Sequence, residues 1–157
     1  MKKLTGFTLI EILLVMGIMA TLSAIAGLSL STLYSKADLN SSQNLLTSEL
    51  KSQQLKAMAG YAPGSSVAVA HGIYFESNKY TLFSGGNFNP DDPANVPLPA
   101  STNVAYSPSN LTDNSIIFLA GSGEIANYLT NATITMTDVN TGETRQVQIN
   151  LMGSISE

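Results

Sequence analysis

A single carboxylate stands inside a long apolar stretch near the start of the chain. Glu11 is the only charged residue between Leu4 and Ser35, and the run that follows it consists mainly of Ile, Leu, Val, Met and Ala. Inserting a carboxylate into the apolar centre of a membrane costs roughly 2.5–3.5 kcal/mol, so such a group usually has a partner and a purpose. Glu11 is therefore the first residue for which we expect a chemical role, the pairing of a buried charge.

Two lysines precede the apolar stretch. Lys2 and Lys3 give it a basic start, and no charged residue occurs from Ile12 to Leu30. About 20 apolar residues in a helix span the ~30 Å hydrocarbon core of a bilayer. A secretory signal peptide would have a shorter apolar run, of roughly 7–15 residues, and a small-residue cleavage site, which is not evident here. A plain membrane anchor fits the length but gives no reason for Glu11.

The order of these features resembles the start of a known family. Type IV prepilins and type II secretion pseudopilins begin with a similar segment, which here reads Lys2-Lys3-Leu4-Thr5-Gly6-Phe7-Thr8-Leu9-Ile10-Glu11 and runs directly into the apolar stretch. The resemblance implies that residues 1–6 are a leader, which a prepilin peptidase removes by cutting between Gly6 and Phe7. It also implies that the new amino group of Phe7 is methylated, and that Glu11 meets the amine of a neighbouring subunit in a filament.

Elementary physical chemistry agrees with these implied roles. Lys2 and Lys3 would hold the leader on the cytoplasmic side by the positive-inside rule, and Gly6 has no side chain to obstruct a protease that binds the backbone. Cutting after Gly6 creates an α-amine that is largely cationic at neutral pH. Glu11 lies one helical turn away, and pairing removes most of the cost of an unpaired buried charge. The alternative is that Glu11 only reaches the lipid headgroups.

The composition offers little material for an enzyme. The 157 residues include no Cys, which excludes disulfides and thiolate metal sites. With no Trp and a single His, they also offer little material for the usual hydrolytic triads and for His-based metal sites. His71 lies in register with the apolar face of a predicted strand, so we expect it to be packed or hydrogen-bonded and not a ligand. Asp91 and Asp92 fall far short of the six to eight oxygen ligands that calcium needs. We expect no catalytic residue, no metal site and no cofactor.

A long helix is expected to continue beyond the apolar stretch. No Pro or Gly occurs from Leu33 to Ala59, and the apolar positions there follow one helical stripe, formed by Leu39, Leu46, Leu50 and Ala57. Residues 60–64 then include Gly60, Pro63 and Gly64, residue types that end helices. We predict one helix from about Thr8 to Ala59 within a segment 7–60, of which about residues 9–33 cross the membrane.

The remaining residues, 61–157, change to the two-residue period of β-strands. Strands are predicted at residues 67–75, 79–83, 116–120, 132–137 and 146–151. In the last two, the inward-facing residues are expected to be Ala132, Ile134, Met136, Val147, Ile149 and Leu151. The sequence Asn140-Thr141-Gly142 predicts a hairpin turn between them. One-sided strands suit an antiparallel sheet packed against the helix, so the expected fold class is α+β and pilin-like.

Residues 84–114 are predicted to form a long loop. This stretch holds five of the six prolines, two adjacent glycines and six asparagines. Loops longer than ~12–15 residues are unusual and tend to be functional or mobile. Loops also carry specificity on rigid scaffolds, so this loop is a candidate for contact with a partner.

The order of the elements over the whole chain resembles the minor pseudopilin H or FimT-like class. The similarity includes the long helix, a hairpin carrying Tyr74 and Tyr80, a short apolar strand at 116–121, and a last strand running into Gly153. This resemblance implies a single-pass protein of the inner membrane. Its β-rich globular head, residues 61–157, would lie in the periplasm or outside the cell. The implied partners are the prepilin peptidase, other pilin or pseudopilin subunits in a homo- or heteropolymer, an inner-membrane assembly platform, and membrane lipid.

Two classes of function remain open. In the first, the chain is a structural subunit of a type II secretion pseudopilus or a type IV pilus. In the second, it is a tip or minor pilin that binds DNA or an adhesion target. Removal of Lys2 and Lys3 leaves five basic residues against eleven acidic ones; phosphate contacts need clustered Lys and Arg, so nucleic-acid binding is disfavoured. A third class, an enzyme on a membrane tether, has no catalytic constellation to support it.

Overall fold

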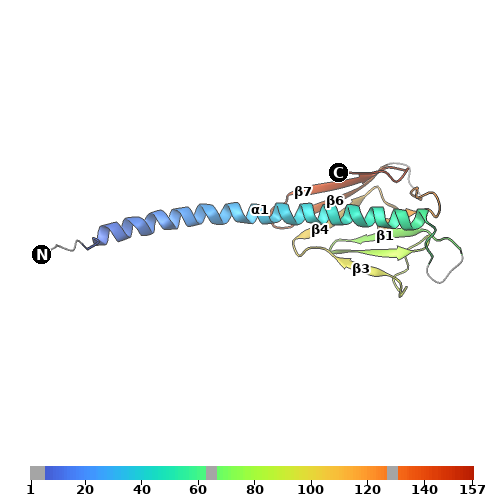
Figure 1. The fold of residues 1–157 in the computed structure, drawn as a ribbon, viewed down its shortest axis with the longest axis horizontal. Coiled ribbons are helices and arrows are strands. Elements are labelled where there is room, and N and C mark those ends of the chain that lie inside the picture. Colours follow the sequence, from blue (N-terminus) through green and yellow to red (C-terminus); the bar gives the residue numbers. More distant parts are fainter. Residues whose placement is uncertain (1–5, 63–66, 127–130) are drawn as a thin grey trace. The chain divides into compact units, whose positions relative to one another are not determined.

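Helix α1 spans Leu9–Met58 and is the longest element of the chain (Figure 1). The computed structural model describes residues 6–62, 67–126 and 131–157, and of residues 25–32 it describes the backbone alone. The chain divides into two compact units, Met1–Tyr34 and Ser35–Glu157, and α1 contributes to both. All of the strands that the structure describes lie in the second unit.

Two four-stranded antiparallel sheets form the β-rich part of the second unit. The first has the order β3-β2-β1-β5 and consists of β3 (Val96–Pro99), β2 (Lys79–Ser84), β1 (His71–Glu76) and β5 (Ser115–Phe118). The second has the order β4-β6-β7-β8 and consists of β4 (Val104–Ser109), β6 (Ala132–Asp138), β7 (Thr144–Ile149) and β8 (Ile155–Ser156). A short 3-10 helix, Thr112–Asn114, precedes β5. The predicted α+β class is confirmed, with two sheets where one was expected.

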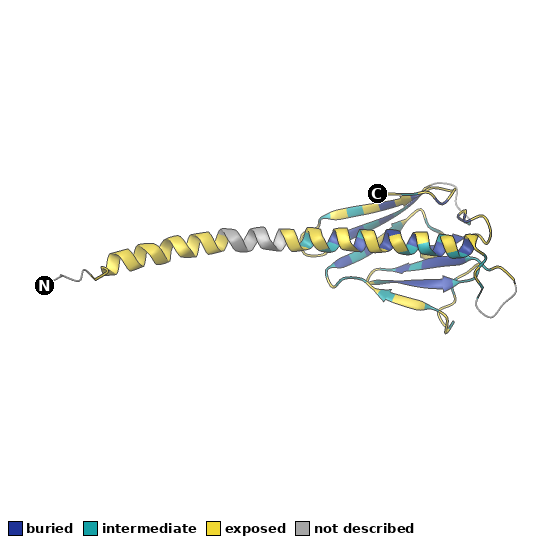
Figure 2. Cartoon of the chain, in the orientation of Figure 1, coloured by how far each residue is buried: buried dark blue, intermediate teal, exposed yellow. Residues whose placement is uncertain are grey.

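One hydrophobic core joins the second half of α1 to both sheets (Figure 2). The predicted helical stripe is confirmed, because Leu39, Leu46, Leu50 and Ala57 are all fully buried. The first sheet adds Ile73, Phe75, Tyr80, Ile116 and Phe118, and the second adds Tyr106, Ile134, Met136, Val147 and Ile149. Burial of this apolar surface is the main force that holds the head together.

Two predictions at strand ends were wrong. β1 begins at His71, so Val67 lies outside it and is 69% exposed. β7 ends at Ile149, and Leu151 is 43% exposed instead of facing inward. The side chain of Asn150 explains the second error: its Oδ1 accepts hydrogen bonds from the backbone N–H groups of Met152 and Ser154, at 3.1 and 2.9 Å. Asn side chains of this kind replace a strand by a turn.

The predicted long loop at residues 84–114 was also wrong. It contains β3, β4 and the 3-10 helix, and the longest irregular part is the stretch between β2 and β3. The prediction treated each proline as evidence for a loop. Proline is tolerated on the edge strand of a sheet, where its missing N–H faces away from the neighbouring strand.

Both proline-bearing strands lie at sheet edges. β3 carries Pro97 and Pro99 and pairs only with β2, while β4 carries Pro108 and pairs only with β6. Two other backbone N–H groups of β4 are used outside the sheet: Val104 donates to the carbonyl of Ser101 at 2.9 Å, and Tyr106 donates to the carbonyl of Ser77 at 3.0 Å. The outer edge of β4 therefore presents no free backbone N–H group at Val104, Tyr106 or Pro108.

Candidate functional site

The residues assigned to cleavage and methylation, Gly6 and Phe7, come just before the first turn of α1. A Cβ built on Gly6 would meet no atom within 4 Å, and Phe7 is 85% exposed. The peptide bond between them is therefore not covered by any described part of the chain. Lys2 and Lys3, to which the sequence assigned the leader charge, lie outside the described residues.

Thr8 and Glu11 form a reciprocal cap at the start of α1. The backbone N–H and the hydroxyl of Thr8 both donate to Oε2 of Glu11, at 2.8 Å each, and the Glu11 backbone N–H donates to the Thr8 hydroxyl oxygen at 3.4 Å. This arrangement is a capping box, which satisfies backbone donors that the start of a helix leaves without partners. It fixes the carboxylate of Glu11 on the first turn of the helix.

Sequence reasoning did not assign a role to Thr8. The signal was present, because Thr8-Leu9-Ile10-Glu11 is a Thr-x-x-Glu motif directly before an apolar run. The cap changes the interpretation of Glu11, whose carboxylate already accepts two hydrogen bonds within the single chain. Both bonds go to Oε2, and a carboxylate has about four acceptor sites. Glu11 can therefore keep its cap and still accept a cation.

The first half of α1 presents uncovered apolar side chains. Every described residue from Gly6 to Ala24 is exposed. Phe7 and Glu11 line one shallow depression together with Ile12, Val15 and Met16. A continuous apolar surface of this kind marks a site of contact with lipid or with other apolar surfaces.

A helix that crosses a bilayer must be both long enough and apolar enough. No helix within the described residues meets both requirements.

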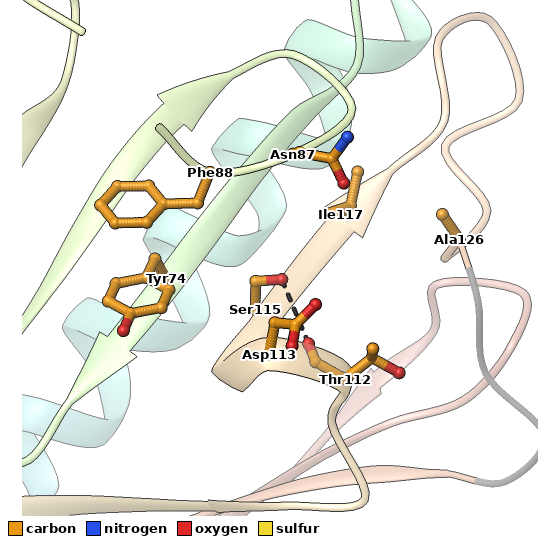
Figure 3. A pocket seen from close by; sticks show the side chains of 8 residues that line it. All are labelled: Tyr74, Asn87, Phe88, Thr112, Asp113, Ser115, Ile117 and Ala126. Carbon is orange, nitrogen blue, oxygen red and sulfur yellow. Dashed lines mark hydrogen bonds between the residues drawn. The ribbon is translucent and has the colours of Figure 1, made fainter. Parts of the chain in front are cut away.

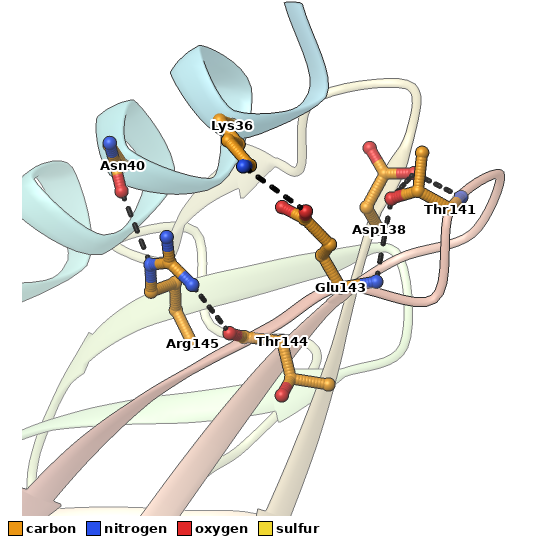
Figure 4. Close-up of polar contacts among 7 residues, drawn as sticks. All are labelled: Lys36, Asn40, Asp138, Thr141, Glu143, Thr144 and Arg145. Carbon is orange, nitrogen blue, oxygen red and sulfur yellow. Dashed lines mark hydrogen bonds and ion pairs between the residues drawn. The ribbon is translucent and has the colours of Figure 1, made fainter. Parts of the chain in front are cut away.

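Polar contacts tie α1 to the β6–β7 hairpin within the second unit (Figure 4). Lys36 Nζ lies 3.7 Å from Glu143 Oε1, and Arg145 Nε donates to Asn40 Oδ1 at 3.3 Å. One turn later, Gln43 Nε2 donates to the backbone carbonyl of Gln146 at 3.2 Å. These contacts fix the hairpin against the helix without burying an isolated charge.

A buried carboxylate organises the turn of the same hairpin. Asp138 is fully buried, and its Oδ1 accepts hydrogen bonds from the backbone N–H and the hydroxyl of Thr141, at 2.8 and 3.1 Å (Figure 4). The backbone N–H of Asn140 donates to the same oxygen at 2.9 Å. The bond from the Thr141 N–H is the main cause that lowers the pKa of Asp138 from its usual value. The predicted turn at Asn140-Thr141-Gly142 is confirmed, with Gly142 in the left-handed region at a φ of 72°.

His71 was predicted to be packed or hydrogen-bonded, and the structure shows it buried with both ring nitrogens hydrogen-bonded. Its Nε2 lies 2.7 Å from the carbonyl oxygen of Tyr61, and its Nδ1 lies 3.3 Å from the hydroxyl of Ser84. A carbonyl only accepts, so Nε2 carries the proton, and Ser84 then donates to Nδ1. His71, in β1 of the first sheet, is therefore joined to the segment that follows α1 and has no nitrogen left for a ligand.

A cavity in the head lies beside a stacked aromatic pair (Figure 3). The rings of Tyr74 and Phe88 are 4.1 Å apart and 7° from parallel. The cavity measures about 210 Å³ and is also lined by Asn87, Thr112, Asp113, Ser115, Ile117 and Ala126. None of the described residues that line it is a histidine or a lysine. Across the part of the chain that the structure describes, no three His, Cys, Asp or Glu residues lie together as metal ligands would.

Two parts of the chain match known families. Residues 1–27 match the prokaryotic N-terminal methylation motif, and residues 39–153 match the type II transport protein GspH family. The chain belongs to the GspH family. Neither a curated protein nor a solved structure matches it.

The two matches confirm the family resemblance, which was drawn from the amino-terminal motif and from the order of the elements. A GspH-family chain with a methylation motif is a pseudopilin of the type IV pilin class, a structural subunit that prepilin peptidase processes. It assembles with other pilin or pseudopilin subunits into a membrane-anchored filament. The individual roles of Gly6, Phe7 and Glu11 stay predictions.

Proposed function

We propose that the chain is made as an inner-membrane precursor, cut between Gly6 and Phe7 and methylated at the Phe7 amine. The exposed Gly6–Phe7 peptide and the methylation motif over residues 1–27 support this assignment. Lys2 and Lys3 hold the leader in the cytoplasm. The mature subunit crosses the inner membrane once, through about residues 9–33, with its head outside the cytoplasm. Residues 61–157 form that head together with the end of a helical segment 7–60.

The observation that carries the assembly mechanism is the Thr8–Glu11 cap at the start of an uncovered apolar helix. The cap holds the Glu11 carboxylate on the first turn, where it accepts the Phe7 amine of a neighbouring subunit. Lipid and a bundle of helices are similarly apolar, so transfer of the helix between them provides little direction by itself. An alignment of neighbouring helices that leaves the amine or the carboxylate buried without a partner is strongly unfavourable. The alignment in which the two charges meet is therefore selected.

The remaining assignments concern partners. Extraction from the bilayer requires an inner-membrane assembly platform, and membrane lipid covers the apolar half of α1 in the stored subunit. We assign no enzymatic activity to the chain, because its part in the filament is structural. The acidic balance after cleavage, with five basic against eleven acidic residues, agrees with a protein partner and not with nucleic acid.

Three variants separate the charge of Glu11 from its capping role. Glu11→Gln keeps a side chain that serves in a capping box but removes the charge. Thr8→Ala weakens the cap and keeps the charge, and Glu11→Ala removes both. Filaments sheared from cells are quantified by immunoblot and inspected by electron microscopy, with membrane insertion and processing measured in parallel.

We expect both Glu11 variants to insert and to be processed, yet to enter filaments at least about tenfold less than the unsubstituted chain. Thr8→Ala should assemble nearly normally. Normal filaments from Glu11→Gln would overturn the pairing role. A loss in Thr8→Ala equal to that in Glu11→Gln would assign the effect to the cap instead.

A further inference from the structure

Two aromatic rings lie on the outer face of the first sheet, away from the hydrophobic core. Ile73 and Phe75 of β1 are buried in the core, so Tyr74 between them points to the opposite face. Phe83 of β2 pairs with Gly72, two residues before Tyr74, and therefore faces the same way. A Cβ built on Gly72 would lie 2.5 Å from the Phe83 ring, so the missing side chain of the glycine makes room for that ring.

A third ring, that of Phe88, comes from the loop between β2 and β3, residues 85–95, which we name the Phe88 loop. Phe88 stacks on Tyr74 (Figure 3) and meets Phe83 edge to face, with ring centres 5.4 Å apart and planes at 64°. We name the place between Tyr74 and Phe83 the aromatic seat. Offset-stacked and edge-to-face contacts are the arrangements that aromatic rings prefer, so the seat suits a planar ring.

The rest of the Phe88 loop is held mainly by its own hydrogen bonds. The backbone N–H of Asp92 donates to the carbonyl of Asn89 at 3.2 Å, and the backbone N–H of Asn95 donates to the carbonyl of Asp92 at 3.1 Å. Asn95 Nδ2 also donates to the Asn89 carbonyl, at 2.7 Å. The loop starts with Gly85, which has a φ of 116°, and Gly86, whose Cβ would meet nothing within 4 Å. A compact turn on two glycines can move as one body.

Two cavities adjoin the stacked pair. The first is the cavity of about 210 Å³ described above, and the second measures about 450 Å³ and is also lined by Lys79, Thr81, Pro90 and Pro97. Among the described residues, only Tyr74 and Phe88 line both. The stacked pair therefore separates the two cavities. Withdrawal of the Phe88 ring would join them into one groove with the aromatic seat in its middle.

The first cavity carries an unpaired negative charge. Asp113 lines it, is exposed, and forms no ion pair with any residue that the structure describes. In the second cavity, by contrast, Glu76 and Lys79 pair with each other, with Oε2 and Nζ 3.0 Å apart. Charge complementarity therefore favours a cationic group in the first cavity.

We propose that the Phe88 loop is a plug, and that a partner polypeptide displaces Phe88 and puts an aromatic side chain of its own into the aromatic seat. The seat already holds a phenylalanine ring, so its shape suits that group. A Lys or Arg next to the aromatic residue of the partner pairs with Asp113. The family assembles with other protein subunits, and a groove on both sides of the seat has room for the residues that flank the ring. The site uses no residue of the amino-terminal assembly mechanism.

Binding is tested on the full mature chain in detergent micelles, with 4-fluorophenylalanine in place of phenylalanine. The probes are three dipeptides with acetylated and amidated ends: Lys-Phe, Lys-Leu, which lacks the ring, and Glu-Phe, which reverses the charge. We expect Lys-Phe to shift the ¹⁹F resonance of Phe88 saturably, because it takes the place of that ring. Lys-Leu and Glu-Phe should bind at least about tenfold more weakly.

Phe88→Ala tests the plug. Phe88 is half-buried and lies outside the hydrophobic core, so we expect this variant to fold. The probe no longer competes with the plug, so Lys-Phe should bind at least about tenfold more tightly, followed through the ¹⁹F resonance of Phe83. Leu55→Ala removes an exposed apolar side chain of α1 outside both cavities and should bind like the unsubstituted chain.

Asp113→Asn tests the charge pairing. This variant should lose the preference for Lys-Phe over Glu-Phe, whereas Glu124→Gln, the same charge change at an exposed residue outside both cavities, should retain it. Absence of saturable Lys-Phe binding, equal binding of Lys-Leu, or an unchanged preference in Asp113→Asn would overturn the proposal. Binding by Phe88→Ala alone would also overturn it, because Phe88 would then be a fixed part of the head.

Discussion

Gln54 of α1 donates a hydrogen bond to the carbonyl oxygen of Gly153, at 3.1 Å, and the same Nε2 donates to the carbonyl of Gly123 at the same distance. Both glycines lie in the left-handed region, with φ values of 76° and 71°. One amide of the helix thus holds two turns that are 30 residues apart in the sequence. The end of α1 is fixed to both sheets through the chain segments that leave β5 and β7.

Gly153→Ala should destabilise the head. The added Cβ would overlap Gln54 Nε2 and lie 2.6 Å from the Gly123 carbonyl oxygen, in a backbone conformation that L-residues rarely adopt. We expect the free energy of unfolding to fall by about 1–3 kcal/mol, measured by urea unfolding followed by tyrosine fluorescence. Gly86→Ala is the control, because its Cβ would meet nothing within 4 Å. Equal stability of the two variants would show that Gln54 does not hold this turn.

Gly6→Val should block processing. A β-branched side chain next to the Gly6–Phe7 bond obstructs a peptidase that binds the backbone closely, and Gly6 is otherwise free of contacts that the substitution would disturb. Mass spectrometry of the membrane fraction should find the chain with its six leader residues still attached. Gly17→Ala, in the helix and also free of contacts, should be processed normally. A mature Phe7 terminus in Gly6→Val would contradict the assigned cleavage site.

The stability of the head should fall on acidification because of Asp138. Hydrogen bonds, first of all from the Thr141 backbone N–H, lower the pKa of Asp138 in the folded chain below the unfolded value of about 3.9. The folded state therefore favours the charged form. This contribution is complete above the unfolded pKa and is lost as the pH falls through the lower folded-state pKa.

Asp138→Asn tests this dependence. Urea unfolding at a series of pH values should show that the variant is less stable at neutral pH and loses less stability on acidification below about pH 4. Asp91→Asn, at an exposed residue, removes the same charge and should retain the full acid-induced loss. Identical pH profiles for Asp138→Asn and the unsubstituted chain would rule out Asp138 as the source.

Periodicity predicted most of the core but not the pairing of its strands. The stripe from Leu39 to Ala57 and the alternation at Ile134 and Val147 depend only on residues near one another in the sequence, and all of these side chains are buried. The division into two sheets depends on long-range pairing, such as β5 with β1, which no local pattern encodes. Strands β3 and β4 were not predicted, because proline is common in loops and is also accepted on the edge strands of sheets.

The candidate site was partly readable from the sequence. Glu11 was identified by its isolation among apolar residues, and its capping partner Thr8 was readable from the Thr-x-x-Glu spacing but was not recognised. The cavity between the end of α1 and the first sheet could not have been predicted. Gln53 and Lys56 lie on a helix, while Leu82 and Val96 come from two strands, and only the folded head brings them together.

The prolines of β3 and β4 have a consequence for molecules that share a crowded membrane. Strands at an open border can recruit the same strand of another molecule, which leads to aggregates. Pro97, Pro99 and Pro108 cannot donate to an incoming strand, and the N–H groups of Val104 and Tyr106 are already taken. The outer edges of β3 and β4 therefore offer little to an incoming strand, so crowding of copies in a filament does not lead to strand exchange along these two borders.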